Sequence, residues 1–226
     1  MNPETPVRKS IPVLYEDNSY VAFDKPAGLL VVATPKKEKH TLVDIVNAEI
    51  RPAQSEKFYP CHRLDRETSG VILFAKGHRN EELMIKQFQN MAVKKKYIAF
   101  VQGKLKNRAG EIKSYIRDFE QRKFQKDTPA KLAITRYKVL EVRRRFSIVE
   151  VVPLTGRTNQ IRIHFSEIHH PLVGERKYAF GRDFELRFRR AALHALELEW
   201  QHPVYRKKIV VTAPLPEDME NFWSQN

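Results

Sequence analysis

The stretch His62-Arg63-Leu64-Asp65-Arg66-Glu67-Thr68-Ser69-Gly70 leads directly into the apolar run Val71–Ala75. The apolar run has the length and composition of a buried strand, and a polar loop next to such a strand is held still by the sheet. Loops fixed in this way are common places for a binding or catalytic site. Asp65 is the unusual member, because it is an acid between Arg63 and Arg66. The local residues leave two interpretations open, a surface ion pair or a functional carboxylate.

Further strand-like segments lie on both sides of this stretch. They are expected at Val21–Phe23, Leu29–Val32, Tyr97–Val101, Glu111–Ile116, Leu132–Val139, Phe146–Val152, Leu193–Trp200 and Ile209–Thr212. Two of them alternate clearly, so that Ala133 and Thr135 share one face of their strand, as Leu198 and Trp200 do in theirs. Many strands with few helices between them favour an α+β fold built on an extended, largely antiparallel sheet.

Helices are fewer, and their starts are indicated by capping residues. The expected starts are Thr41, Asn80, Thr158 and Pro216. Asp44, three residues after Thr41, can complete a capping box. In the second helix, Met84, Phe88 and Met91 form the expected buried stripe.

Positive charge dominates the composition. The 226 residues include 41 Lys and Arg against 27 Asp and Glu, a formal net charge of +14. This excess indicates a polyanionic partner, either nucleic acid or an anionic membrane surface. The membrane alternative has no support, because no apolar run approaches the roughly 20 residues of a spanning helix and no basic amphipathic helix is visible. Cys61 is the single cysteine, so no internal disulfide is possible, and a cytoplasmic location is expected.

Several catalytic templates do not fit the loop around Asp65. Its H-R-L-D order differs from that of the kinase catalytic loop, and no Gly-rich phosphate loop precedes it. Ser69 lacks a G-x-S-x-G elbow, and Cys61 has no second cysteine to complete a zinc site. These catalytic motifs therefore do not identify the reaction.

Six blocks of the sequence, taken in order, resemble one family. The block His62–Gly70 resembles the H-R-L-D-x-x-T-S-G hallmark of the RluA-type pseudouridine synthases. The other blocks are Lys25–Gly28 (K-P-A-G), Lys95–Ala99 (K-x-Y-x-A), Gly156–His164 (G-R-T-H-Q-I-R-x-H in the family), His170–Gly174 and Leu193–Ala195. The resemblance implies the pseudouridine synthase fold, an α+β architecture. Its extended, mostly antiparallel mixed sheet is flanked by helices and has a central RNA-binding cleft.

The resemblance also implies an activity, the isomerisation of specific uridines to pseudouridine in structured ribosomal or transfer RNA. This reaction needs no metal and no cofactor, but the target base must be flipped out of its stack. Asp65 is assigned as the attacking group, and attack on the ribose, attack on the uracil ring and abstraction of a ribose proton all stay open. We expect Arg157 as the cationic partner of Asp65, with Arg162 as the reserve, because a sheltered carboxylate stays charged only when it is paired. The alternative for Arg157 is a phosphate contact at a helix start.

Other matched residues are expected to bind the RNA. Arg63 can fill the stacking position that the flipped base leaves. Tyr97 can stack on the uracil or relay a proton, although a core aromatic on a strand is the alternative. Leu193 is expected in the apolar wall of the pocket, or in plain core packing. Lys95 and Lys96 belong to a basic surface that follows the phosphates.

The chain departs from the family pattern in two places. Asn159 stands where the family usually has histidine, so it can hydrogen-bond but cannot carry a titrating proton. Residues 1–10 are expected to form a flexible arm and residues 11–226 one catalytic domain, without a separate N-terminal RNA-binding domain. We expect a monomer that binds RNA and has no obligatory protein partner. The competing hypothesis is a catalytically inactive, basic RNA-binding module.

Overall fold

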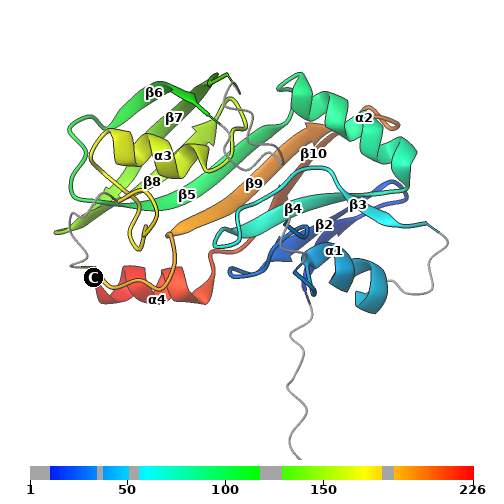
Figure 1. The fold of residues 1–226 in the computed structure, drawn as a ribbon, viewed down its shortest axis with the longest axis horizontal. Helices are drawn as coiled ribbons and strands as arrows, with labels where there is room; N and C mark the ends of the chain where they lie inside the picture. The colour runs from blue at the N-terminus through cyan, green and yellow to red at the C-terminus, as the bar shows by residue number, and fades with distance from the viewer. Residues whose placement is uncertain (1–10, 35–37, 51–55, 118–128, 180–185) are drawn as a thin grey trace, which may run out of the picture.

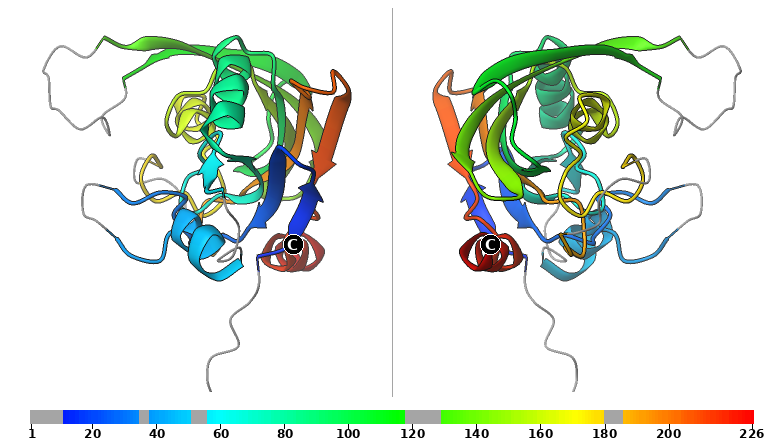
Figure 2. Two further views of the ribbon diagram at one scale, coloured as in Figure 1. Left: turned by 90° about the vertical axis from the view of Figure 1, so that its right-hand side faces the viewer. Right: turned by 90° about the vertical axis from the view of Figure 1, so that its left-hand side faces the viewer.

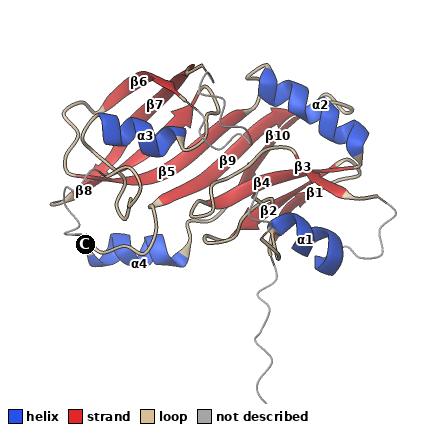
Figure 3. Cartoon of the chain, in the orientation of Figure 1, coloured by secondary structure: helices blue, strands red, loops and turns tan. Residues whose placement is uncertain are grey.

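A computed structural model of the chain describes residues 11–34, 38–50, 56–117, 129–179 and 186–226 (Figure 1). In these ranges ten strands form one sheet, with the order β1-β2-β4-β9-β5-β8-β7-β6, β10 beside β9 and β3 beside β4. The strands are β1 (Val13–Glu16), β2 (Tyr20–Lys25), β3 (Phe58–Pro60), β4 (Ser69–Lys76), β5 (Lys94–Gln102), β6 (Ala109–Ile116), β7 (Lys131–Val142), β8 (Phe146–Pro153), β9 (Leu193–Gln201) and β10 (Lys208–Thr212). The helices are α1 (Leu42–Ile45), which continues into the π-helical turn η1 (Val46–Ile50), α2 (His78–Gln89), α3 (Gln160–Glu167) and α4 (Glu217–Gln225) (Figure 3).

Side-chain alternation along the central strands sorts the helices onto two faces of the sheet. On β4, Phe74 packs into the core beneath α1, whereas its neighbour Leu73 packs into the core beneath α2. On β5, Val101 packs beneath α3 and Phe100 beneath α4. Tyr97 contacts both the α1 and the α3 cores, so these two helices lie on one face of β5 and α4 lies on the other. The end-on views of Figure 2 show the strong curvature of the sheet.

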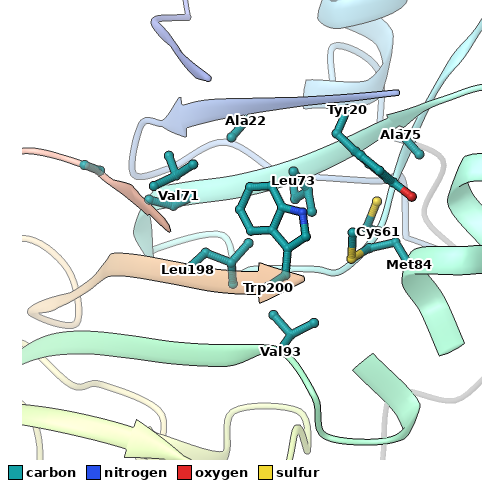
Figure 4. Packing of buried hydrophobic residues seen from close by; sticks show 12 residues of the cluster. Tyr20, Ala22, Cys61, Val71, Leu73, Ala75, Met84, Val93, Leu198 and Trp200 are labelled. Carbon is teal, nitrogen blue, oxygen red and sulfur yellow. The ribbon is translucent and has the colours of Figure 1, made fainter. Parts of the chain in front are cut away.

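The core beneath α2 is centred on an aromatic side chain at the end of β9. Trp200 is buried, with Leu198 and the α2 residue Met84 in the same cluster (Figure 4). Its ring meets that of Tyr15 edge-on, at 5.7 Å between centroids. Burying each such side chain stabilises the fold by about 1.5–3 kcal/mol, which fixes α2 on the sheet.

The sheet is mixed because β4 and β9 run parallel over one short stretch. Only Ser69 with His194 and Gly70 with Ala195 are paired in this way among the described residues. Gly70 has φ +108°, and a Cβ atom there would lie 2.2 Å from the Ala195 carbonyl oxygen. Glycine is therefore required at this crossing, which lies directly after the loop that contains Asp65.

Most predicted strands are confirmed, and Leu29–Val32 is the exception. This segment is a loop in the structure. The Leu42 N–H donates to the Leu30 carbonyl at 2.7 Å, and the Val43 N–H donates to the Val31 carbonyl at 3.1 Å. The segment therefore supplies acceptors to the first turn of α1 instead of joining the sheet. The short strands β1 and β3 were not predicted, and the expected arm at residues 1–10 lies outside the described residues.

The predicted helices are present, with corrected ends. The capping box of Thr41 and Asp44 is confirmed at α1, and Pro216 caps α4. The helix expected to be capped by Asn80 begins three residues earlier, because Gly77 is the N-cap of α2. Met91 was wrongly placed in the buried stripe, since it follows the helix end with φ +56° and is 66% exposed. No helix of the described segments has the length and apolar character needed to cross a bilayer.

Three histidines make the stability of the fold depend on pH. Burial lowers the pKa of His164 and of His194 from 6.5 to about 4, and that of His62 from 6.5 to about 3. Between these values the unfolded chain binds protons that the folded chain does not, so stability is lost as the pH falls from about 6.5 towards 4. At pH 5 we expect the free energy of unfolding to be lower by about 2 kcal/mol per histidine than at pH 8, measured by urea denaturation.

The control is His164→Phe, which removes one titrating ring and adds no buried polar group. Neither ring nitrogen of His164 has a hydrogen-bond partner, so no hydrogen bond is lost. The variant should lose roughly a third of this pH dependence, since His62 and His194 still titrate. An unchanged dependence would contradict the assignment to His164.

Candidate active site

The backbone of the loop between β3 and β4 presents Asp65 at the surface. Leu64 is buried in the core beneath α1 and anchors the loop. The Thr68 N–H donates to the Asp65 carbonyl at 3.1 Å, and the Gly28 N–H donates to the Arg66 carbonyl at 2.8 Å. The Asp65 side chain is 27% exposed. The carboxylate is therefore accessible, while the chain that carries it is fixed.

Arg162, on α3, forms an ion pair with Asp65. Its Nη1 atom lies 3.8 Å from the Asp65 Oδ2 atom, and its side chain is only 9% exposed. The other side of the guanidinium binds Glu175, with Nε donating to Oε2 at 2.6 Å and Nη2 donating to Oε1 at 2.8 Å. Glu67 Oε2 lies 3.8 Å from Nη2. One guanidinium thus connects three carboxylates, and its planar two-pronged contact with Glu175 fixes its direction.

Glu175 is the carboxylate that holds Arg162 in place. Its side chain is fully buried. Burial alone would raise the pKa of Glu175, but the Arg162 hydrogen bonds and charge, and the N–H groups of Lys177 and Tyr178, lower the pKa overall. Glu175 is therefore charged at neutral pH, and the buried pair is mutually compensated. Sequence reasoning missed Glu175, although an acid directly after the His170–Gly174 block was a visible signal.

The predicted ion pair between Arg157 and Asp65 is corrected by these contacts. Arg157 precedes α3 and directs its Nε atom to the Leu132 carbonyl of β7, at 3.2 Å. Arg162, the reserve candidate, lies within the helix and faces the Asp65 loop. The position before the helix thus turns Arg157 towards β7, where it is partly buried.

Asn159 is the N-cap of α3 and has a role in this arrangement. Its backbone is left-handed, with φ +55°, a conformation that asparagine adopts more readily than most residues. Its Oδ1 atom accepts a hydrogen bond from Arg162 Nη1 at 3.0 Å. Asn159 therefore orients the same nitrogen that faces Asp65, a contact that needs no titrating proton.

Tyr97 lies on β5 between the two cores that meet at the site. The pairing of β5 with β9 shifts register between Lys96 and Tyr97, and irregularities of this kind re-aim side chains next to active sites. Burial and the negative charge of Asp65 raise the pKa of the Tyr97 phenol. The phenol is therefore protonated at neutral pH and lies within electrostatic reach of Asp65.

Comparison with known proteins identifies this arrangement. Residues 19–167 match the family model described as RNA pseudouridylate synthase. The chain belongs to that family. The resemblance to the RluA-type synthases is thereby confirmed, and the protein is an RNA pseudouridine synthase, an isomerase that acts on RNA.

Individual relatives support this family and its fold. The chain is 36% identical over 196 residues to the dual-specificity RNA pseudouridine synthase RluA of Vibrio cholerae, covering 85% of this chain and 78% of the relative. It is 31% identical over 232 residues to tRNA pseudouridine synthase C of Haemophilus influenzae, covering 94% and 96%. The solved structure of human RNA pseudouridylate synthase domain containing 4 superposes with a TM-score of 0.77 at 24% identity, over 94% of this chain and 92% of that one. The predicted pseudouridine synthase fold is confirmed.

In the synthase, Lys25 ties the K-P-A-G turn to the loop of Asp65. Its ammonium group is buried and donates to three carbonyls, those of Pro26 at 2.9 Å, Leu29 at 2.8 Å and Arg66 at 3.2 Å. Burial and the Arg190 charge lower the pKa of Lys25 to about 7, while Asp65 acts in the opposite direction. The three donors of a lysine are matched by three acceptors, so Lys25 fixes the backbone of the synthase around the site.

The remaining predicted residues of the synthase lie in different environments. Lys95 is on the same face of β5 as Tyr97 and donates to the Thr155 carbonyl at 3.2 Å. Burial and the Arg157 charge lower the pKa of Lys95 to about 8. Lys96 points to the other face, where its Nζ atom lies 3.3 Å from Glu197 and 3.8 Å from Glu150.

Arg63 is exposed on the loop, and Leu193 is buried beneath α3. Across the described ranges, no group of three His, Cys, Asp or Glu residues could hold a metal ion.

Proposed function

We propose that this synthase isomerises specific uridines in transfer RNA and that Asp65 is the attacking carboxylate. The observation that supports the proposal is the ion pair of Asp65 with Arg162, at 3.8 Å, on a partly exposed loop beside Tyr97. In the reaction, the bond from uracil N1 to the ribose C1′ breaks and a bond from C5 to C1′ forms, the C5 proton is released, and N1 takes up a proton from water. An ionised carboxylate suits the nucleophilic role, and an arginine partner keeps it ionised.

The proposed RNA surface lies on the face of the sheet that α1 and α3 cover. Lys95 and Arg157 lie near each other there, since the Arg157 charge helps burial to lower the pKa of Lys95. Arg63, exposed two residues before Asp65, is placed to fill the stack when the base flips out. Lys96 is left out of this surface, because Glu197 and Glu150 already neutralise it. The domain makes its own RNA contacts in this proposal, and the monomeric state and cytoplasmic location stay predictions.

The choice of transfer RNA is supported by the relative that matches this chain almost end to end. That relative, of which 96% is covered, is named tRNA pseudouridine synthase C. The shorter match, to the Vibrio protein, is with a synthase named for dual specificity. Ribosomal RNA is therefore the competing substrate in the test.

The test is tritium release from RNA labelled at C5 of uridine, because pseudouridine formation frees that hydrogen. Unmodified transfer RNA transcripts and large-subunit ribosomal RNA fragments are offered separately to the wild-type protein. We expect release from one or more transfer RNAs and little from the ribosomal fragments. Release from ribosomal RNA alone would overturn the transfer RNA assignment. Tight binding of both RNAs without release from either would favour the inactive RNA-binding module.

A further inference from the structure

Arg190 is a buried arginine behind the loop of Asp65, and every N–H group of its guanidinium donates to protein. Its side chain is 8% exposed. Nη1 donates to the carbonyls of Glu67 at 3.0 Å, Leu193 at 3.1 Å and Ala191 at 3.2 Å. Nη2 donates to Ser69 Oγ at 3.3 Å. Arg190 therefore joins the end of the Asp65 loop to the starts of β4 and β9.

Asp218, in the first turn of α4, orients this guanidinium. Arg190 Nε donates to Asp218 Oδ2 at 2.7 Å, and Nη2 donates to Oδ1 at 2.9 Å. Such a two-pronged contact fixes the plane of the arginine as well as its position. Met219 and Phe222 bury the same helix against the sheet, so α4 is a firm anchor for Asp218.

The contacts of Arg190 continue to the catalytic pair through Glu67. The Glu67 carbonyl accepts from Arg190, and its Oε2 atom accepts from the N–H of Ala191 at 3.1 Å. That same Oε2 atom lies 3.8 Å from Arg162 Nη2. Arg162 in turn pairs with Asp65. A short chain of charge and hydrogen-bond contacts thus runs from α4 to Asp65.

The backbone of Arg190 supports the other side of the same arrangement. A Cβ atom at Gly174 would lie 2.0 Å from the Arg190 carbonyl oxygen, so the turn at Gly174 packs directly on this residue. The next residue in the turn is Glu175, which binds Arg162 from the side opposite Asp65. Arg190 therefore contacts both segments that determine where the Arg162 guanidinium lies.

We propose that Arg190 and Asp218 are positioning residues for the isomerisation, and that helix α4 sets the geometry of Asp65 and Arg162 through them. The proposal rests on the proposed role of Asp65. Neither residue acts on the RNA in this account. Misplacing a reacting group by about 1 Å can slow a reaction about 100-fold, so small shifts transmitted through Glu67 are sufficient.

The test compares three variants in α4 with the wild-type protein. Asp218→Asn keeps the shape of the side chain but removes its charge and turns one acceptor into a donor that faces the guanidinium. Asp218→Glu restores the carboxylate. Trp223→Phe is the matched control, because it removes a different α4 anchor, the 3.1 Å hydrogen bond from Nε1 to Glu141. All three change half-exposed positions and are expected to fold, which thermal melting checks.

The readout is single-turnover tritium release at saturating protein, with RNA affinity measured separately. We expect Asp218→Asn to slow release about tenfold or more with RNA affinity within about twofold. Asp218→Glu should recover most of the rate, and Trp223→Phe should release tritium at the wild-type rate even if its melting temperature falls. A purely structural role for the ion pair would lower the melting temperatures of Asp218→Asn and Trp223→Phe alike and leave both rates unchanged, which would overturn the proposal.

Asp65→Asn is assayed in parallel, so that the two proposals can fail separately. An inactive Asp65→Asn together with a fully active Asp218→Asn overturns the positioning role alone. An Asp65→Asn variant with wild-type activity overturns the role of Asp65 and the positioning role that rests on it.

Discussion

Replacing Arg162 by methionine is expected to slow single-turnover tritium release by at least about 100-fold. The guanidinium faces Asp65, Glu67 and Glu175, and its loss leaves three carboxylates close together without their shared cation. Glu175 is fully buried, so removal of its partner should also lower the free energy of unfolding by about 3–5 kcal/mol. Urea denaturation measures the second effect.

Two companion variants separate the loss of geometry from the loss of charge. Arg162→Lys keeps a positive charge but cannot make the two-pronged contact with Glu175, so it should fold better than the methionine variant and remain at least about tenfold slow. Arg157→Met tests the partner that the sequence first indicated. Loss of its partly exposed positive charge should lower RNA affinity, while the rate at saturation stays within about threefold of wild type. A larger rate loss in Arg157→Met than in Arg162→Lys would show that the partner has been misassigned.

Runs of apolar residues in the sequence predict the strands of the sheet well where a strand is buried on both faces. The run Val71–Ala75 is apolar throughout because β4 is buried on both faces, beneath α1 and beneath α2. Thr41 and Asp44 lie close in sequence, so their capping box could be read directly. Leu29–Val32 has the same apolar character as a strand, but its carbonyls cap the first turn of α1. Nothing within the segment distinguishes the two outcomes, because the competing partner lies outside it.

The candidate site was predictable where it depends on the matched loop. Asp65 and the neighbouring Tyr97 were identified from the sequence, and the structure brings them within electrostatic reach. The arginine partner was predicted only as one of two residues, Arg157 first and Arg162 in reserve, and these lie on either side of a helix start whose N-cap, Asn159, is left-handed. A cap conformation of this kind is set by the fold and is not visible in spacing.

Other residues of the site also fall into two groups, those whose position the sequence pattern predicts and those whose contacts appear only in the folded structure. Lys95 and Lys96 were predicted as one basic surface, although strand alternation already places adjacent residues on opposite faces. The contacts of Glu175 and Arg190 join segments that are far apart along the chain, so they become visible only when the sheet is assembled.

Asp65→Asn is expected to abolish turnover while it leaves the RNA complex intact. Asparagine has nearly the same shape but no negative charge, so it cannot serve as the carboxylate nucleophile. The Arg162–Glu175 pair does not depend on Asp65, and the loop backbone is held by Gly28 and Lys25. RNA affinity should therefore stay within about threefold of wild type, since phosphate contacts dominate it. Glu111→Gln, which removes an acid from an exposed ion pair on β6, is the matched control.

The decisive measurement is the single-turnover rate of tritium release from uridine-labelled transfer RNA by Asp65→Asn, with the protein in excess over the RNA. The account predicts a rate at least about 1,000-fold below wild type, with Glu111→Gln indistinguishable from wild type. Release by Asp65→Asn at the rate of the unaltered protein would contradict it, because some other group would then have to begin the reaction.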